Sequence, residues 1–443
     1  MSTSKKMAIL VAGGPAPGIN SVIGSVTIRA AIEGVEVVGL RDGFKWIMQG
    51  DINHTQELTI DNVSRIHFRG GSYLGIARDN PTKNPEHLQN VVDSLLRLNV
   101  DKLITIGGDD TAFSAMTLEK LAAGRIRVVH VPKTIDNDLD LPHGIPTFGY
   151  QTARHIGVEI VKNLMVDANT TSRWYFAVAM GRKAGHLALG IGKAAGASMT
   201  LISEEFKGEY ISIQEMVDVL VGSIIKRRSY GREDGVAVLA EGLVERIDPK
   251  ELAEITDVEL DEHDNMRIAE IDFGRIIKQE VQKRLVEMNI NTTIVAKDIG
   301  YEVRCADPIP FDMEYTRDLG HSAAQFMLDG GNAAMVSIQE GNFVPMYFKD
   351  ILDPKTNKTK VRMVDVKSEY FKIARRYMLR LKMSDFEDQE ELAKYAATTG
   401  LTVEEFRNRF YTVIENDLLY SDGNMSENGI GSPQVDGSTR LTK

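Results

Sequence analysis

The sequence predicts an α/β fold built from two doubly wound, Rossmann-like lobes, with the functional site in the cleft between them. Short β-branched runs alternate with helical patterns over most of the 443 residues, which is typical of largely parallel sheets. These runs are too many for one six-stranded sheet, so we divide the chain into two lobes. Doubly wound sheets bind their ligands at the carboxyl ends of the strands.

The expected strands are apolar and rich in Val and Ile, and they lie at residues 7–11, 35–40, 103–106, 128–131, 175–180, 199–203, 236–240 and 335–339. Three segments between them carry apolar residues at spacings of three and four, as helices that cover a sheet should. These segments are residues 88–98, 154–165 and 213–226. We interpret them as purely structural helices.

Spacing of these elements predicts the domain organisation. A first lobe is expected at residues 1–148 and a second at 149–298, with part of 300–345 returning to the first lobe. Residues 346–420 are expected to form a C-terminal helical extension without a catalytic role. The tail 421–443 is rich in Ser, Gly and Asn and poor in apolar residues, so we expect it to be disordered.

Composition excludes several classes of function. The net charge of -11 argues against nucleic acid or an anionic membrane as a partner, so phosphate binding must come from local cations and backbone amides. The single cysteine, Cys305, cannot form an intrachain disulfide, which fits a reducing cytoplasm. The apolar run near the N-terminus ends at Gly13 and Gly14 and is too short for a signal peptide or a membrane span. We therefore expect a soluble, cytoplasmic protein.

Two glycine-rich turns follow expected strands and precede expected helices, at 12-AGGPAPGIN-20 and 107-GGDDT-111. Backbone amides in such turns can face an anion, so both predict a phosphate cradle. Glycine turns that serve only close packing are the alternative. The second turn also contains two adjacent carboxylates, Asp109 and Asp110, which is unusual where phosphate is expected to bind.

A third glycine-rich loop, 69-RGGSYLGIAR-78, is bracketed by two arginines. The glycines let the backbone approach a ligand, while an arginine can bind phosphate with two parallel hydrogen bonds. The alternative is a solvated surface turn. Of the two arginines, Arg78 is the better candidate for phosphate binding.

The segment 131-VPKTIDNDLD-140 places Lys133, Thr134, Asp136 and Asp138 within six residues after a strand. An Asx-rich turn without chemistry is the alternative. Two like charges at this spacing make most sense if one binds a cation and the other accepts a proton. Phosphoryl transfer to a sugar hydroxyl needs both functions, a base and Mg²⁺.

Taken in order, the motifs GGPAPGIN, RGGSYLGIAR, GGDDT, PKTIDND and 180-MGRKAGH-186 resemble those of the phosphofructokinase family. The resemblance extends from residue 7 to about residue 380. The forms GGDDT and PKTIDND are similar to the pyrophosphate-dependent branch of the family. ATP-dependent enzymes of bacterial type usually have glycine in place of Asp110 and of Lys133.

This resemblance implies a role for each site residue. Asp136 resembles the general base for the C1 hydroxyl of fructose 6-phosphate, and Asp109 and Asp138 resemble carboxylates associated with Mg²⁺. Thr134 would hydrogen-bond the transferring phosphoryl group, and Lys133 and Arg182 would join Asp136 and Thr134 in catalysis. The expected phosphate-donor site comprises Gly13, Gly14, Arg78, Gly108, Asp110 and Thr111. The expected sugar-phosphate site comprises Arg173, Met180, Gly181, Arg182, Glu241, Tyr301 and Arg304.

An oligomer is also implied, because Arg173 matches an arginine that the family usually supplies to the neighbouring subunit. A homodimer or homotetramer is therefore expected. The sequence departs from the family at two places: Val295 stands where many relatives have a second intersubunit arginine, which Lys297 could replace, and Tyr301 replaces a histidine seen in many ATP-dependent enzymes. For Arg173, Glu241 and Tyr301, the alternatives are a surface charge, a helix-dipole partner and a half-buried ring.

The leading hypothesis is a reversible transfer of phosphate from pyrophosphate to fructose 6-phosphate, a step of glycolysis. An ATP-dependent phosphofructokinase is the closest rival, and a kinase that acts on NAD or lipid diols on a related fold is less favoured. A non-catalytic sugar-phosphate-binding regulator is the alternative from a different class. We expect the carboxylate of Asp110 to repel a nucleotide's α-phosphate, unless it merely caps a helix that begins near Thr111.

Overall fold

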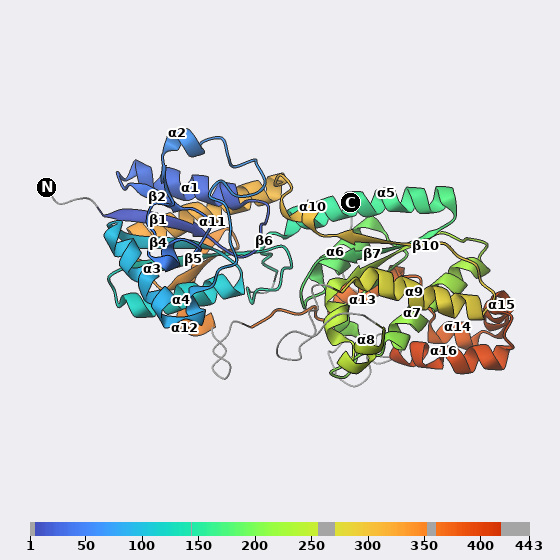
Figure 1. Ribbon diagram of the computed structural model, residues 1–443. Coiled ribbons are helices and arrows are strands. Elements are labelled where there is room, and N and C mark those ends of the chain that lie inside the picture. The colour runs from blue at the N-terminus through green and yellow to red at the C-terminus, as the bar shows by residue number, and fades with distance from the viewer. Residues whose placement is uncertain (1–4, 143, 256–270, 352–359, 418–443) are drawn as a thin grey trace, which may run out of the picture.

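The computed structural model describes residues 5–142, 144–255, 271–351 and 360–417. Two lobes lie side by side, each a parallel-rich sheet with helices on both faces (Figure 1). None of the helices in the described ranges combines the length and the apolar composition that a bilayer crossing needs. The expected α/β fold of two doubly wound lobes is confirmed.

The first lobe contains an eight-stranded sheet in the order β12-β11-β5-β4-β1-β2-β3, with β6 paired to β5. Its edge strands β3 and β12 run antiparallel to their neighbours, and the other pairs are parallel. The strands are β1 (Lys6–Val11), β2 (Val37–Leu40), β3 (Thr55–Leu58), β4 (Val100–Gly107), β5 (Arg127–Thr134), β6 (Phe148–Gly149), β11 (Ala334–Gln339) and β12 (Asn342–Tyr347).

Helices cover both faces of this sheet. Along β1, Met7, Ile9 and Val11 pack on the side of α1 (Ile19–Ile32) and α11 (Pro310–Leu328), while Ala8 and Leu10 pack on the opposite side. That opposite side is covered by α3 (Pro85–Arg97) and α4 (Asp109–Ala122). Both faces are buried, so the strands read as continuous apolar runs. The remaining short elements are α2 (Ile60–Val63), α12 (Phe348–Ile351) and the 3₁₀ turns Ile47–Gln49 and Pro81–Lys83.

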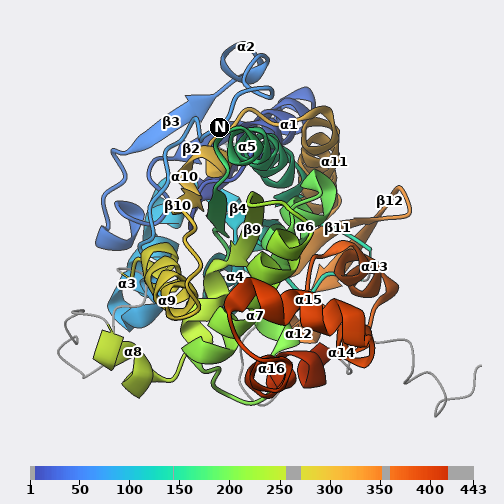
Figure 2. The same ribbon diagram turned by 90° about the vertical axis from the view of Figure 1, so that its right-hand side faces the viewer.

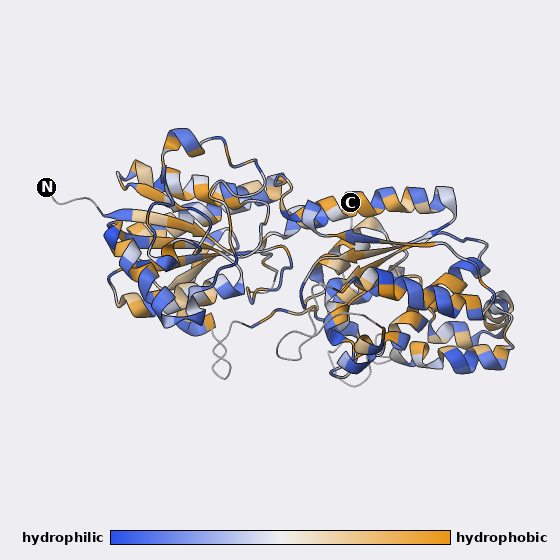
Figure 3. Cartoon of the chain, in the orientation of Figure 1, coloured by the Kyte–Doolittle hydropathy of each residue, from blue (hydrophilic) through white to orange (hydrophobic). Residues whose placement is uncertain are grey.

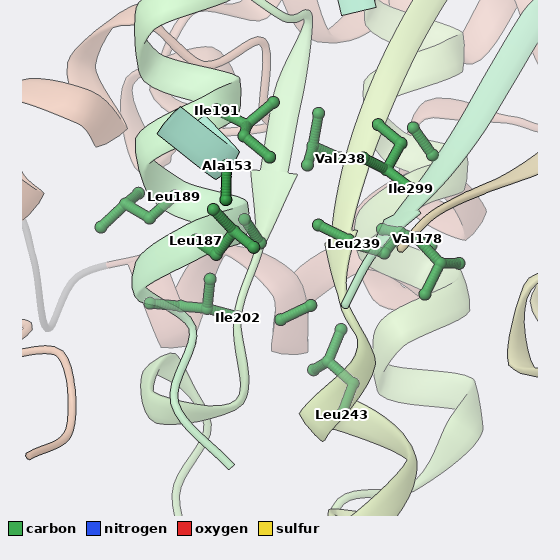
Figure 4. Packing of buried hydrophobic residues seen from close by; sticks show 14 of the residues in the cluster. Ala153, Val178, Leu187, Leu189, Ile191, Ile202, Val238, Leu239, Leu243 and Ile299 are labelled. Carbon is green, nitrogen blue, oxygen red and sulfur yellow. The ribbon is translucent and has the colours of Figure 1, made fainter. Parts of the chain in front are cut away.

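The second lobe contains a four-stranded parallel sheet in the order β10-β7-β9-β8. Figure 4 shows how Leu187 and Ile191 of α6 lie on the side that faces Val238 and Leu239 of β9, while Leu189 points the other way. The strands appear apolar in both lobes and the outer helix faces polar (Figure 3). The elements are α5 (Tyr150–Thr171), β7 (Trp174–Ala179), α6 (His186–Ala195), β8 (Met199–Leu201), α7 (Ile213–Ser229), β9 (Gly235–Ala240), α8 (Pro249–Ile255), α9 (Phe273–Glu287) and β10 (Ile294–Ile299), with 3₁₀ turns at Ser203–Glu205 and Glu241–Arg246.

The chain passes between the lobes more than once. After α10 (Tyr301–Arg304) it returns to the first lobe, where α11 packs on α1 and β11 pairs with β5. β12 and α12 keep the chain in that lobe as far as Ile351. Residues 360–417 then return to the second lobe, where α15 and α16 pack against α7 (Figure 2). These helices are α13 (Glu369–Tyr377), α14 (Met383–Glu387), α15 (Gln389–Thr399) and α16 (Val403–Asp417), and the tail 421–443 lies outside the described residues.

All eight expected strands are present, within a few residues at each end. Four strands within the described residues were missed, and each has a physical reason. β3 is a short edge strand, β6 has only two residues, β10 carries charged residues on its exposed positions, and β12 is an edge strand that contains Pro345. The helix expected to begin near Thr111 is present as α4, which begins two residues earlier, at Asp109.

Candidate active site

Neighbouring strands bring the glycine loops of the first lobe together. β1, β4 and β5 are adjacent and parallel, so their carboxyl ends meet at one edge of the sheet. A Cβ atom built on Gly13 would lie 3.7 Å from Lys133 Nζ, 3.8 Å from Thr111 Oγ1 and 4.0 Å from Gly108 N. The ammonium group of Lys133 also donates a hydrogen bond to the carbonyl oxygen of Gly14. The two glycine turns and Lys133 therefore surround one small volume.

Glycine is required at Gly107 and Gly13 for different reasons. A Cβ on Gly107 would lie 2.3 Å from Cβ of Thr111, so a side chain there would displace the first turn of α4. Gly13 has a φ of 85°, which side chains rarely adopt. The ring of His130 is fully buried next to this turn. It forms hydrogen bonds with the carbonyl oxygen of Gly107 at 3.1 Å and with the Thr105 hydroxyl at 2.9 Å. These hydrogen bonds of His130 help to fix the geometry of the loop.

The loop 69–78 lies directly beside the first glycine turn. Ala77 forms an isolated parallel bridge with Ala12, and its carbonyl oxygen accepts a hydrogen bond of 3.2 Å from the N–H of Gly13. The side chain of Asn20 fixes this loop further, because its Oδ1 accepts from the N–H of Tyr73 at 2.7 Å. Arg78 follows Ala77 immediately and is exposed. The structure therefore brings Arg78 to the edge of the first glycine turn.

The two acids of the GGDDT loop occupy the first turn of α4. The N-cap residue is Gly108, which has no side chain to cap the helix, and Asp109 and Asp110 are the first two helical residues. Asp109 is half-buried and Asp110 is exposed. The alternative that Asp110 caps this helix is wrong. Its position in the first turn still allows a favourable interaction with the helix dipole.

The segment that carries Asp136 and Asp138 turns sharply at the end of β5. The N–H of Asp136 donates to the Thr134 hydroxyl at 3.0 Å, and Asn137 between the two acids adopts a left-handed φ of 57°. Asp138 is only 8% exposed. Burial and, to a smaller degree, the negative charge of Asp138 raise the pKa of Asp136 to about 7. A carboxyl group with this pKa can exchange a proton near neutral pH.

A turn of the second lobe reaches this carboxyl group. It begins at Met180, directly after β7, and a Cβ built on Gly181 would lie 3.9 Å from Asp136 Oδ1. The N–H of Gly181 donates to Glu241 Oε2 at 3.0 Å, which fixes the turn to the end of β9. Arg182 follows, and both its main-chain N–H and its guanidinium lower the pKa of Asp136 against the effect of burial. The two lobes therefore meet at Asp136.

A second contact between the lobes involves α10, through its last residue, Arg304. Arg304 lies with its guanidinium 4.6 Å from the ring centroid of Tyr301, which is 78% exposed. A Cβ built on Gly14 would lie 3.8 Å from Arg304 Nη1. Arg304 thus extends from α10, just after β10, to the glycine turn at residues 12–20 of the first lobe.

Positive charge converges on this region although the chain as a whole is acidic. Burial lowers the pKa of Lys133 to about 8, while the negative charge of Asp136 acts to raise it. The charges of Arg182 and Arg304 also lower the pKa of Lys133, since three cations lie within electrostatic reach of one another. Such a cluster favours a polyanionic ligand.

Arg173 does not join these residues within one chain. It precedes β7, whereas Met180 follows it, and a six-residue strand is about 20 Å long at roughly 3.3 Å per residue. Arg173 lies 4.0 Å from the carboxylate of Asp167 instead. Lys297 is also engaged elsewhere, because its ammonium lies 3.0 Å from Glu302 Oε1. The length of β7 therefore separates Arg173 from the turn at Met180, and its expected contact with a neighbouring subunit stays a prediction.

Sequence reasoning missed Arg362, which contacts the loop that carries the two acids. Its guanidinium donates to the carbonyl oxygens of Asn137 at 3.1 Å and Ile145 at 2.9 Å. No motif marks this residue, which lies more than 200 positions after the loop that it contacts. Asn137 offered a weak signal, because Asn is one of the few residues that adopts a left-handed conformation.

A family model described as Phosphofructokinase matches residues 6–327 of the chain. The chain belongs to the phosphofructokinase family. It is 50% identical over 417 residues to the pyrophosphate–fructose 6-phosphate 1-phosphotransferase of Thermotoga maritima, an alignment that covers 93% of this chain and 99% of that protein. A protein of the same name from Naegleria fowleri is 50% identical over 418 residues, which cover 92% of this chain and 96% of that protein.

Solved structures of the family share the fold of this phosphofructokinase. The pyrophosphate-dependent phosphofructokinase from Nitrosospira multiformis matches with a TM-score of 0.64 at 15% identity, over 90% of this chain and 93% of that chain. The pyrophosphate-dependent phosphofructokinase from Marinobacter aquaeolei gives a TM-score of 0.61 at 16% identity, over 90% of this chain and 92% of that chain. At these identities the likeness supports the fold alone.

Proposed function

We propose that this phosphofructokinase moves a phosphoryl group from pyrophosphate to the C1 hydroxyl of fructose 6-phosphate, giving fructose 1,6-bisphosphate and phosphate. The two relatives that are 50% identical to this chain are named for this activity, and the alignments cover nearly the whole length of each. The observation that carries the proposal is the position of Asp136. Its carboxyl group has a raised pKa and lies where the glycine turns of the first lobe meet the 180–186 turn of the second lobe. The reaction is reversible, because donor and product have comparable transfer potential.

Asp136 acts as the general base in this proposal. A base is most effective when its pKa lies near the working pH, and the pKa of about 7 meets that condition. The carboxylate accepts the proton of the C1 hydroxyl while the oxygen attacks the terminal phosphorus of pyrophosphate. The bond from that phosphorus to the bridging oxygen breaks, and the leaving phosphate carries the electron pair away.

The glycine turns at residues 12–20 and 107–111, here called the donor loops, hold pyrophosphate. Lys133 and Arg182 balance charge on the transferring group, and the Thr134 hydroxyl donates a hydrogen bond to it. The remaining donor-side residues are those of the glycine turns with their neighbours, Gly13, Gly14, Gly108, Thr111 and Arg78. Asp110 is exposed at the start of α4 and repels the α-phosphate of a longer nucleotide donor.

Magnesium is the proposed cofactor, held by two carboxylates together with the phosphate oxygens of the substrate. Among the described residues, no group of three or more His, Cys, Asp or Glu side chains could hold an ion alone. Mg²⁺ commonly uses one or two carboxylates together with substrate phosphate oxygens and water. Asp109 and Asp138 supply such carboxylates. When bound, the ion neutralises charge on the phosphate oxygens.

The sugar phosphate occupies the side formed by the second lobe. Arg182 and Arg304 supply the donors for a dianionic phosphate and a hydroxyl-rich ring. Met180, Gly181, Glu241 and Tyr301 line the same side, and Glu241 accepts from sugar hydroxyls. Arg173 reaches the sugar phosphate of a neighbouring subunit, so we propose a homodimer or homotetramer that acts in the cytoplasm.

The test is the formation of fructose 1,6-bisphosphate from fructose 6-phosphate and pyrophosphate, followed with and without Mg²⁺. We expect one phosphate released for each bisphosphate formed, and no turnover after the metal is chelated. Turnover with ATP but not with pyrophosphate would support the ATP-dependent rival. Sugar-phosphate binding without turnover with either donor would support a regulator and contradict the proposal.

A further inference from the structure

A short segment of the C-terminal part of the chain, residues 361–364, connects the loop that carries Asp136 and Asp138 to the second lobe. Val361 forms an antiparallel bridge with Leu139, and the N–H of Arg362 donates to the carbonyl oxygen of Asp138 at 2.7 Å. Figure 1 shows this part of the chain, in orange, crossing from the first lobe to the second. The family model ends at residue 327, so the segment lies outside the matched region.

The side chain of Arg362 holds the acidic loop at both ends. Nε donates to the carbonyl oxygen of Asn137 at 3.1 Å, and Nη2 donates to the side-chain oxygen of the same residue. Nη1 donates to the carbonyl oxygen of Ile145 at 2.9 Å. The planar guanidinium has five N–H donors in a fixed fork, so it can satisfy several loop acceptors at once. A lysine in its place could satisfy only part of this set.

Asn137 is the residue on which these contacts converge. Its left-handed φ of 57° turns the backbone between the two acids, and a non-glycine residue persists in that conformation only when its surroundings hold it there. Its Oδ1 accepts from the N–H of Thr147 at 3.0 Å as well as from Arg362. Without the side chain of Arg362 the turn loses the guanidinium donors and keeps only the main-chain bond from residue 362 to Asp138, so the directions of Asp136 and Asp138 are less well fixed.

The other end of the segment is bonded to the turn of the second lobe. The carbonyl oxygen of Arg362 accepts from Nε2 of His186, the first residue of α6, at 3.1 Å. The N–H of Val364 donates at 3.1 Å to Glu204 Oε1, and the same oxygen accepts from the N–H of Gly185 at 2.8 Å. The segment therefore bonds the acidic loop of one lobe and the 180–186 turn of the other.

We propose that Arg362 is a positioning residue for phosphoryl transfer, which fixes the acidic loop against the 180–186 turn of the second lobe. It does so through the carbonyl oxygens of the loop rather than by contact with substrate. The inference rests on the proposed function, because it assigns the two acids to the reaction. Positioning errors of about 1 Å can cost about 100-fold in rate, so the expected effect is on turnover rather than on binding.

The test compares Arg362→Ala and Arg362→Lys with Arg127→Ala. Arg127 is a suitable control, because it lies at the opposite end of β5, where it donates to the carbonyl oxygen of Met327 at 2.9 Å and lies 4.0 Å from the carboxylate of Asp101. We expect Arg362→Ala to lower kcat between about 10-fold and 100-fold with both KM values changed less than about 3-fold. The lysine variant should regain part of the loss, and Arg127→Ala should keep near wild-type kcat.

Hydrogen exchange supplies a readout that needs no activity. In Arg362→Ala, amides within residues 134–142 should exchange faster than in wild type, while Arg127→Ala should leave them unchanged. If the wild type turned over neither donor, the proposed function would fail, and exchange would still decide whether Arg362 fixes the loop. Unchanged exchange in 134–142, or a kcat for Arg362→Ala equal to that of Arg127→Ala, would overturn the inference.

Discussion

Glu241 accepts a hydrogen bond of 3.0 Å from the main-chain N–H of Gly181. This bond connects the residue that follows β9 to the turn that reaches Asp136. The charge of Glu241 also contributes to the raised pKa of Asp136. The pKa of Asp136, the proposed base in the first lobe, thus depends on groups that the second lobe supplies.

Replacement of Asp136 by Asn should abolish most turnover without abolishing binding. The amide has nearly the same size but cannot accept the C1 proton, and a positioned general base contributes at least about 100-fold. Steady-state kcat and calorimetric binding of fructose 6-phosphate would measure the two effects. Asp140→Asn, an exposed acid of the same loop, is the control and should keep wild-type turnover. Near wild-type kcat in Asp136→Asn would remove Asp136 from the role of base.

The pH dependence of kcat/KM should be bell-shaped with a narrow maximum. Asp136 acts as a base only when it is ionised, so the rate should rise as the pH increases through its pKa of about 7. Lys133 acts only when protonated, so the rate should fall as the pH increases beyond its pKa of about 8. The rising limb should be absent from the residual activity of Asp136→Asn. An optimum below pH 6 in the wild type would be inconsistent with the assigned roles.

Alanine at Arg304 should raise the KM for fructose 6-phosphate by at least about 10-fold, because a charged hydrogen bond contributes roughly 1.5–3 kcal/mol. The position of Arg304 next to Gly14 makes this a discriminating test, since the residue faces the donor loop as well. Both KM values would be measured, with Arg228→Ala as a control in the second lobe, where Arg228 pairs with Glu233. A rise in the KM for pyrophosphate alone would assign Arg304 to the donor.

Glycine at Asp110 should admit ATP and weaken the use of pyrophosphate. The carboxylate is exposed in the first turn of α4, where its charge can repel an α-phosphate. The ratio of kcat/KM for the two donors would be compared in wild type, Asp110→Gly, the double variant with Lys133→Gly, and Asp110→Ala. The alanine variant separates loss of charge from gain of backbone freedom. A donor ratio that stays constant across the single variants would show that Asp110 does not select the donor.

The sequence was sufficient to predict the fold, and the glycine loops that it singled out lie together at one edge of the first sheet. Strands β1, β4 and β5 are buried on both faces and therefore read as apolar runs, and the glycines that end them are forced by close contacts such as that of Gly107 with Thr111. Such features are visible in the sequence, because each depends on residues that lie close together along the chain. The convergence of these loops follows from the parallel sheet itself.

Contacts made by distant parts of the chain could not be predicted in this way. Arg362 bonds a loop more than 200 residues earlier, and the single bridge between Val361 and Leu139 has no periodic signal. Arg173 is different, because its place at the opposite end of β7 from Met180 already follows from the strand expected at residues 175–180. Its expected role needs a second chain, which one sequence cannot position.

The most direct test of the account is the donor preference of the wild-type protein. With fructose 6-phosphate and Mg²⁺ in excess, kcat/KM would be measured for pyrophosphate and for ATP under the same conditions. We expect pyrophosphate to be preferred by at least about 100-fold, because a like-charge contact that costs roughly 3 kcal/mol corresponds to that ratio. An equal or higher kcat/KM for ATP would contradict the proposed function and the role assigned to Asp110.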